Sequence, residues 1–176
     1  MNNKKISLFA DTLRDKLRSE VILKAARLGF TEDTIADVKE YEDSMVINGH
    51  VFGKEIKKQR ADFKEVVSKR GYNEIIDEIT YTWFNRVVAL KFMSENGYVP
   101  VKVFDSSIAG NKEPDLLTKC LELDFMKIDK KKLLELKTKG DDEELYKFLI
   151  LSLCNHLNHI MPFLFEHPID ISRICS

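Results

Sequence analysis

Hydrophobic residues recur along this 176-residue chain at spacings that favour helices over most of its length. In a helix buried on one side, apolar residues return every three to four positions, because that spacing places them on one face. Three long stretches follow this rule, and each is followed by a glycine, which is common just beyond the last turn of a helix. We therefore predict three long helices, over residues 3–28, 54–70 and 73–96.

Between the first two of these helices the pattern changes twice. Thr31 is followed by two acids, an arrangement typical of a capped helix N-terminus, and this predicts a short helix over 31–42. β-branched residues then flank Asn48-Gly49 on both sides. This dipeptide accepts the positive φ angles of a type I′ turn, so we predict one small β-hairpin over about 44–52.

The second half of the chain is also predicted to be helical. Pro100 cannot donate a ladder hydrogen bond, so we expect a short edge strand or an extended connection near 99–104. Further helices are predicted from Pro114 to about Leu123, over DKKKLLELK (129–137), and from Asp141 to about Met161. The predicted fold class is mainly α, a multi-helix arrangement with one hairpin and this extended segment, forming a single domain over residues 1–176.

The third long helix contains the chain's one tryptophan, Trp83, followed by Asn85 and Arg86. Apolar residues cover so much of its circumference that we expect a central helix buried on several sides. A buried amide or guanidinium must find partners, because leaving it unpaired is costly. We therefore assign Trp83, Asn85 and Arg86 to the structural core. We expect Arg86 to pair with a carboxylate such as Glu74 or Glu78, and Asn85 to bond to backbone.

Composition is that of an ordinary globular protein, with 44% hydrophobic and 32% charged residues. The three cysteines form no Cys-x-x-Cys pair, and no apolar stretch follows the charged start of the sequence, which favours a reducing cytoplasm over export. The longest apolar run is far short of the roughly 20 residues that a membrane span requires. We expect a soluble, cytoplasmic protein with no membrane partner.

The net charge of −1 gives no global reason to expect a polyanionic partner, but the basic residues are unevenly placed. Lys and Arg outnumber Asp and Glu by 7 to 3 over residues 1–28, by 7 to 3 over 54–72 and by 6 to 2 over 127–139. Such a helix face can neutralise phosphates without reading bases, whereas a merely solvated face is the alternative. The candidate DNA contacts lie on the 54–70 helix, away from its apolar stripe: Lys57, Lys58, Arg60 and Lys64.

Pro114-Asp115 followed by Glu135-Leu136-Lys137 matches the written form of a PD-(D/E)xK nuclease. In such a site two carboxylates hold Mg²⁺ and the lysine assists the attacking water. That chemistry requires Glu135 and Lys137 on a strand, where residues two apart share one face. A helix points them apart, so the nuclease is the less favoured alternative.

Other catalytic and metal sites find little support. His156 and His159 lie three apart, with Cys154 nearby and His167 downstream, but Cys154 falls on another helical face and a closed zinc site requires four ligands. The chain has no GxxxxGK[ST], GxGxxG or GxSxG motif. It also lacks the adjacent prolines of the loop that amino-methyltransferases use against the target amine. We predict no catalytic, cofactor-binding or metal residue in this chain.

Three blocks of sequence carry a resemblance to a known family: EITYTWFNRVVALKFMSENGYVPVKVFDSS (78–107), KEPDLL (112–117) and CNHLNHIMPFLFE (154–166). In this order they resemble the amino-terminal region of the PglX family, the large adenine-specific DNA methyltransferases of BREX bacteriophage-exclusion systems. The similarity covers most of the chain from Glu78 to Glu166, and LRDKLRSEVILKAARLG (13–29) is similar in a less distinctive way.

The resemblance implies a parent enzyme that transfers a methyl group from S-adenosylmethionine to the exocyclic amine of adenine in DNA. In the family, the cofactor loop and the Asn-Pro-Pro-Tyr catalytic motif lie further along than Ser176, where this chain stops as a truncated gene would. We therefore expect a helical amino-terminal module, catalytically silent alone, whose partners are the downstream methyltransferase domain, other defence-system proteins and DNA. A pure protein–protein interaction module is the alternative, and it predicts an exposed apolar patch.

Overall fold

The computed structural model describes residues 3–165, and these divide into two compact units, one running to Phe84 and the other beginning at Asn85. The mainly α fold class with a small antiparallel sheet is confirmed. The single domain over residues 1–176 stays a prediction. Within the described residues, no helix combines the length and the apolar character needed to cross a membrane.

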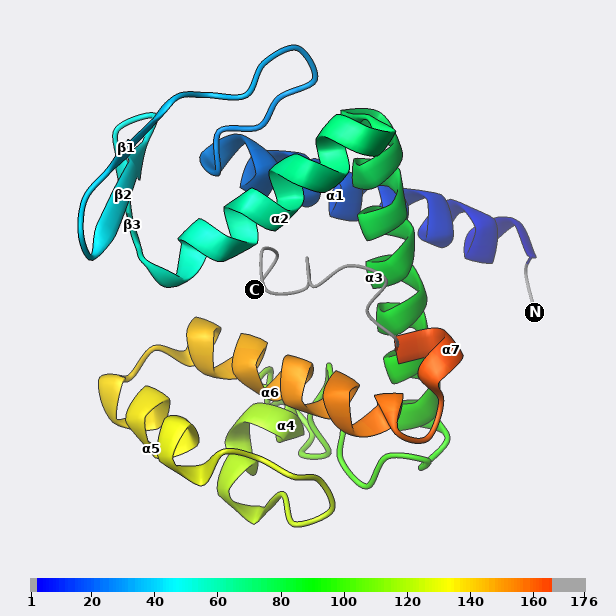
Figure 1. Ribbon diagram of the computed structural model, residues 1–176. Coiled ribbons are helices and arrows are strands. Elements are labelled where there is room, and N and C mark those ends of the chain that lie inside the picture. The colour runs from blue at the N-terminus through cyan, green and yellow to red at the C-terminus, as the bar shows by residue number, and fades with distance from the viewer. Residues whose placement is uncertain (1–2, 166–176) are drawn as a thin grey trace. The chain divides into compact units, whose positions relative to one another are not determined.

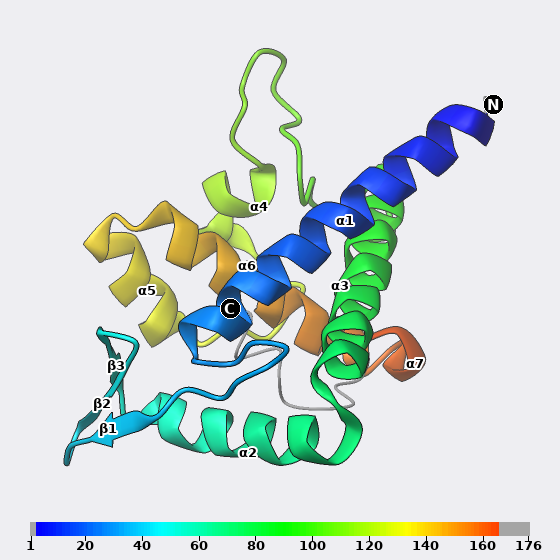
Figure 2. The ribbon, with the colours of Figure 1, turned by 90° about the horizontal axis from the view of Figure 1, so that it is seen from above.

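Unit 1 is built from long helices and a small sheet (Figures 1 and 2). Its elements are α1 (Asn3–Arg27), β1 (Val38–Glu40), β2 (Ser44–Ile47), β3 (His50–Gly53), α2 (Glu55–Arg70) and the first part of α3 (Tyr72–Glu95). The three long helices predicted from the sequence are therefore confirmed. So is the hairpin, because β2 and β3 pair antiparallel across Asn48 and Gly49, whose φ angles are 50° and 83°.

The helix predicted over 31–42 is wrong. Thr31 does not cap a helix: its backbone N–H donates to the Thr34 carbonyl at 2.9 Å, and its hydroxyl accepts from the Thr34 N–H at 3.1 Å. Threonine side chains offer the backbone such local alternatives to a helix. The residues that follow form β1, which pairs with β2 and adds a third strand to the hairpin, in the order β1-β2-β3.

The core of unit 1 joins α1, α2 and α3 through a cluster of buried apolar residues. Phe30 and Phe63 are fully enclosed, with ring centroids 4.7 Å apart and edge to face. Arg60 on α2 is 8% exposed, and its guanidinium lies 5.0 Å from the Phe30 ring centroid. It donates to the carbonyl oxygens of Leu28 at 3.0 Å and Ala36 at 2.7 Å. A buried arginine thus ties α2 to the end of α1 and the segment after it.

Gly29 lies just after the end of α1, where the chain passes close to β2 and the segment before β1. Its φ is +82°, and a Cβ built there would lie 2.7 Å from Ile47 Cγ2 and 2.8 Å from Ala36 Cβ. Glycine suits this position for two reasons: it adopts a positive φ without strain, and it has no Cβ to clash with these neighbours. The glycine predicted as a helix stop therefore also allows β2 to pack against the end of α1.

Unit 2 contains the remainder of α3 and five further helical segments of α or 3₁₀ type. They are α4 (Asp115–Thr118), a 3₁₀ turn η1 (Cys120–Glu122), α5 (Lys130–Lys139), α6 (Asp142–Asn158) and α7 (Pro162–Phe165). The helix predicted from Pro114 to Leu123 is thus a short α-helix and a separate 3₁₀ turn. Asp129 caps α5 by accepting two backbone N–H groups of the first turn, and Asp141 caps α6 by accepting one.

α6 supplies the central stripe of the core of unit 2, with Leu145, Leu149 and Leu153 at successive helical turns and nearly inaccessible to solvent. The segment near 99–104 is not a strand, although it contributes alternate buried valines. Its backbone is satisfied by side chains: Val103 donates its N–H to the Ser94 hydroxyl at 3.0 Å and accepts from the Tyr146 hydroxyl at 2.8 Å.

The sequence predicts that α3 is buried on several sides, and this holds for only part of its circumference. Ile75, Ile76 and Leu90 are fully buried, whereas Val88 is 42% exposed and Phe92 is 59% exposed. A helix with many apolar positions is not necessarily enclosed, because its circumference can be apolar without being covered. The exposed part of α3 contributes to the surface described next.

Candidate functional site

An apolar groove lies on the surface of unit 2, among the described residues. It has a volume of about 450 Å³. Its walls come from the last turns of α3, the segment after it, the residue Phe125, the end of α6 and α7. The lining residues are Ala89, Phe92, Met93, Tyr98, Val99, Pro100, Phe125, His156, Leu157, Ile160, Met161 and Leu164. We refer to this surface as the apolar groove.

Large apolar side chains at the groove are exposed to an unusual degree. Phe92, Tyr98 and Ile160 have exposed fractions of 59%, 68% and 64%, and Phe163, next to the groove on α7, reaches 82%. The Phe92 and Tyr98 rings lie with their centroids 6.1 Å apart. Contiguous exposed apolar surface of this kind marks interaction sites in soluble proteins. The groove can therefore bind apolar side chains of a partner.

Few polar groups line the groove. His156 lies edge to face with Phe125, with ring centroids 6.1 Å apart, and Tyr98 carries the other polar group, its phenol hydroxyl. Recognition of a phosphate or carboxylate would require convergent donors such as arginine. The lining of the groove instead favours an apolar partner with a few polar contacts at its edge.

The candidate DNA contacts on α2 lie in different environments. Arg60 is buried and donates to internal carbonyl oxygens, so its charge does not face solvent. Lys57 donates to the Tyr41 carbonyl at 2.8 Å and pairs with Glu40 at 3.3 Å. Lys58 and Lys64 are exposed and form no ion pair with any described side chain. The freely available part of this basic set is therefore these two lysines.

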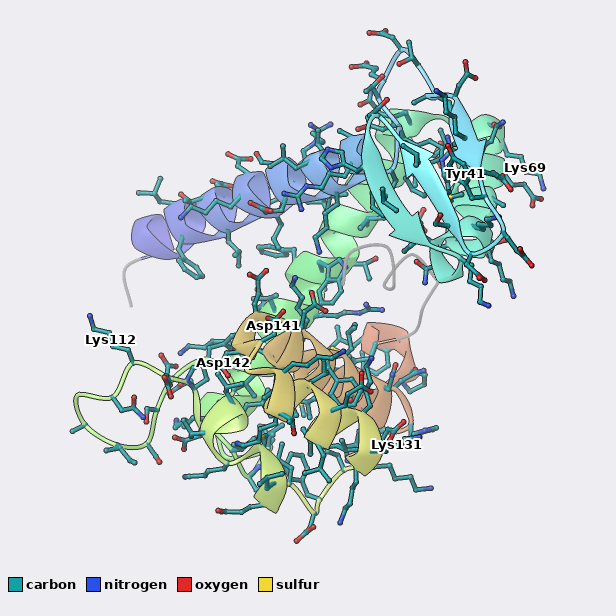
Figure 3. All side chains as sticks on the ribbon, turned by 90° about the vertical axis from the view of Figure 1, so that its left-hand side faces the viewer. Tyr41, Lys69, Lys112, Lys131, Asp141 and Asp142 are labelled. Atoms are coloured by element: carbon teal, nitrogen blue, oxygen red, sulfur yellow. The ribbon has the colours of Figure 1, made fainter. Side chains whose placement is uncertain are left out.

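The three basic segments do not all belong to one unit. Residues 1–28 and 54–72 lie in unit 1, whereas 127–139 lies in unit 2. Figure 3 labels Lys69 of α2, which pairs with Glu65 at 2.6 Å, and Lys131 of α5, which is exposed. Acidic partners already neutralise part of the charge that makes α2 look basic in the sequence.

The polar pair of α3 has two environments. Arg86 is 1% exposed, and its Nη2 donates to the Phe165 carbonyl at 3.4 Å. Burial lowers the pKa of Arg86, and it raises the pKa of the neighbouring Cys154 thiol to about 11, so Cys154 is a neutral thiol at neutral pH. Asn85 and Trp83 are half-buried. Their use as internal bracing stays a prediction.

Both acids named as partners of Arg86 have another partner. Glu74 and Glu78 pair with Arg70, the last residue of α2, and the Arg70–Glu74 distance is 2.7 Å. These contacts raise the pKa of Arg70. The two carboxylates therefore join the end of α2 to the first turns of α3.

The three residues of the nuclease pattern contact different groups. Glu135 pairs with Lys139 at 2.8 Å, one turn along α5, and Lys137 donates to the Cys120 sulfur at 3.4 Å. Asp115 is 2% exposed and accepts from Ser107 and Lys119. Glu135 and Lys137 stand on a helix, where they cannot share one face. The arrangement favours a structural role for each residue over joint metal binding.

The histidines at the end of α6, His156 and the C-cap residue His159, do not come together with other metal ligands in the part of the chain that the structure describes. His156 lines the apolar groove, His159 is exposed, and no cluster of three or more His, Cys, Asp or Glu forms there. His167, the downstream candidate, lies outside the described residues.

Sequence reasoning did not find the apolar groove. Its residues come from five segments that span 75 positions, from Ala89 to Leu164, and each segment alone looks like ordinary core. The signal that could have indicated the groove is the excess of apolar positions around α3. When apolar residues surround a helix but its neighbours do not, some of these residues are left exposed. Which side chains are exposed depends on tertiary packing, which the periodicity of apolar residues does not report.

Comparisons with known proteins support the resemblance found in the sequence. No family model matches the chain. Adenine-specific methyltransferase PglX of Lacticaseibacillus casei (strain Zhang) is 30% identical over 199 residues, and adenine-specific methyltransferase BrxX of Escherichia coli O9:H4 (strain HS) is 28% identical over 194. Both matches cover 99% of this chain, which spans 16% and 15% of the length of these relatives. The chain therefore resembles part of the BREX adenine-specific methyltransferases along almost its whole length.

Proposed function

We propose that this chain is the amino-terminal, non-catalytic module of an adenine-specific DNA methyltransferase that uses S-adenosylmethionine and acts in bacteriophage defence. The observation that carries the proposal is the match over 99% of the chain to a relative of which the chain spans 16%. A module of a larger enzyme would match its relative in this way, along almost all of its own length but over only a small part of the relative.

The chemistry of the chain is consistent with a silent module. Its glycines lie singly at turns and helix ends, so the described residues offer no glycine-rich loop for the cofactor. We assign S-adenosylmethionine binding and methyl transfer to the remainder of the polypeptide. The module then serves as a scaffold, and its surfaces contact the methyltransferase domain, DNA or other defence proteins.

Methylation by the longer polypeptide tests this function. The reading frame beyond Ser176 should encode an Asn-Pro-Pro-Tyr loop, and the whole polypeptide should place N6-methyladenine in host DNA, measured by single-molecule sequencing. A version that lacks residues 1–176 should still bind S-adenosylmethionine in calorimetry but methylate poorly. A reading frame that ends without encoding the Asn-Pro-Pro-Tyr motif would contradict the proposal. So would methylation by residues 1–176 alone.

A DNA-contacting role is supported by Lys58 and Lys64, which are exposed on α2 without an ion pair among the described side chains. Each lysine that neutralises a phosphate contributes to the slope of log affinity against log salt concentration, and its removal lowers that slope by about 1. Gel-shift titrations at several salt concentrations should show this change for Lys58→Gln and for Lys64→Gln. Lys112→Gln, an exposed lysine of the loop before α4, is the matched control. Equal slopes in all proteins would remove the DNA role.

The second candidate function is a protein–protein interaction module that makes no DNA contact. The apolar groove favours it, because the exposed side chains there are aromatic and aliphatic. Two results together would support this role. The 176-residue chain should not bind DNA at low salt, and the longer protein should methylate DNA only when residues 1–176 are present.

A further inference from the structure

We propose that the apolar groove is the docking site for an amphipathic helix contributed by the methyltransferase portion of the same polypeptide. This inference rests on the proposed function and adds to it the surface, the residues and the chemistry of the contact. The helix would insert two or three large apolar side chains at helical spacing between the end of α3 and the end of α6.

The shape and lining of the groove select this occupant. The described residues of unit 2 contain no strand, so no sheet edge there can extend into a partner strand. The groove lacks an arginine or lysine in its lining, which disfavours acidic or phosphorylated segments. Its volume of about 450 Å³ and its apolar walls fit a row of aliphatic and aromatic side chains.

The exposure of apolar side chains at the groove indicates that the described residues leave it uncovered. Ile160 and Phe163 are 64% and 82% exposed although Leu157, one turn before Ile160, is 3% exposed in the same core. Most of each matched relative lies outside the aligned part, since the chain covers only 15% and 16% of them. A cover supplied within one polypeptide is also favoured by its high effective concentration.

The test compares hydrogen–deuterium exchange in two proteins, the 176-residue chain and the longer polypeptide. Backbone amides in peptides covering residues 89–100 and 156–165 should exchange about tenfold more slowly in the longer polypeptide. Peptides from the loop over 106–113, which is remote from the groove lining, should exchange equally in both. Protection elsewhere in the chain but none at the groove would overturn the inference while leaving the proposed function intact.

Two matched variants of the longer polypeptide sharpen the test. Ile160→Asp places a charge in the groove, and Ile108→Asp places the same charge at a site of nearly equal exposure, 62% against 64%, outside the groove. Ile160→Asp should restore the fast exchange at residues 89–100, and Ile108→Asp should leave the protection unchanged. Equal behaviour of the two variants would overturn the inference.

Two further outcomes assign the groove to another occupant or remove it. The groove of the 176-residue chain could become protected as the protein concentration rises, and Ile160→Asp could abolish this protection. That result would assign the surface to a second copy of the chain and overturn the inference. A reading frame without a methyltransferase part would defeat the proposed function and the inference together. Each failure is therefore recognised by a different measurement.

Discussion

Replacement of Asp115 by asparagine is expected to show how unit 2 holds the loop before α4. Asp115 is 2% exposed, and its Oδ1 accepts from the Ser107 backbone N–H at 2.9 Å and from the Ser106 hydroxyl at 3.3 Å. Its Oδ2 accepts from the Lys119 ammonium at 3.0 Å. Asp115→Asn keeps the shape of the side chain but removes the charge and one of the two acceptor oxygens.

The magnitude follows from the pKa of Asp115. Burial alone would raise this pKa, but hydrogen bonds from Ser107 and Lys119 lower it from 3.8 to about 2. At 1.36 kcal/mol for each pH unit, the carboxylate contributes about 2 kcal/mol to the free energy of unfolding. Because the folded pKa is depressed, this contribution is complete above the pKa of the unfolded state. It is lost as the pH falls from about 4 through about 2.

Urea denaturation followed by circular dichroism checks this expectation. At about pH 7, Asp115→Asn should lower the free energy of unfolding by about 2 kcal/mol, and the difference from the wild type should shrink as the pH falls below about 4. Glu135→Gln is the control, since Glu135 pairs with Lys139 on the exposed side of α5 and its loss should change stability little. A difference for Asp115→Asn that stays constant with pH would refute the electrostatic reasoning.

Three further predictions concern other buried contacts. Arg60→Met should lower the free energy of unfolding by about 2–4 kcal/mol in denaturant titrations, because two internal carbonyls lose their donor. Gly29→Ala should cost about 3 kcal/mol, whereas Gly110→Ala, with a similar positive φ but open space, should cost about 1. Burial raises the pKa of Tyr146 to about 12, so stability should fall above about pH 10, where only the unfolded state ionises this tyrosine. Tyr146→Phe should lack this part of the loss and should unfold about 1 kcal/mol more easily at neutral pH.

Local sequence signals were sufficient for the long helices and the hairpin. Asn48-Gly49 specified the turn between β2 and β3 because few other dipeptides adopt two positive φ angles without strain. The apolar spacing of the three long helices extends over many turns, so chance interruptions do not hide it. Elements of this length carry enough repeated information for a prediction from the sequence alone.

Short segments were not predictable in the same way. The acids after Thr31 favour a helix start, but Val38–Glu40 gains ladder hydrogen bonds with β2 that no local rule contains. Likewise, the segment near 99–104 has the alternating valines of a strand, yet Ser94 and Tyr146 supply its backbone partners. In both cases a contact with a distant element decided the conformation.

The candidate sites show the same dependence on distant contacts. Lys and Arg on α2 were counted as one basic face, but Arg60 donates inward to Leu28 and Ala36, and Lys57 is engaged by Tyr41 and Glu40. A charge count cannot distinguish a cation that ties segments together from one that meets solvent.

Removal of Arg60 from the candidate contacts changes the balance between the two proposed roles. Counterion release scales with the number of phosphates neutralised, so two available lysines support far weaker DNA binding than a four-residue basic face would. The apolar groove keeps all its exposed side chains, among them Phe92, Tyr98 and Ile160. Burial of such residues contributes free energy in proportion to the apolar area covered. Of the two proposed roles, contact with the rest of the polypeptide is therefore better supported than DNA contact by α2.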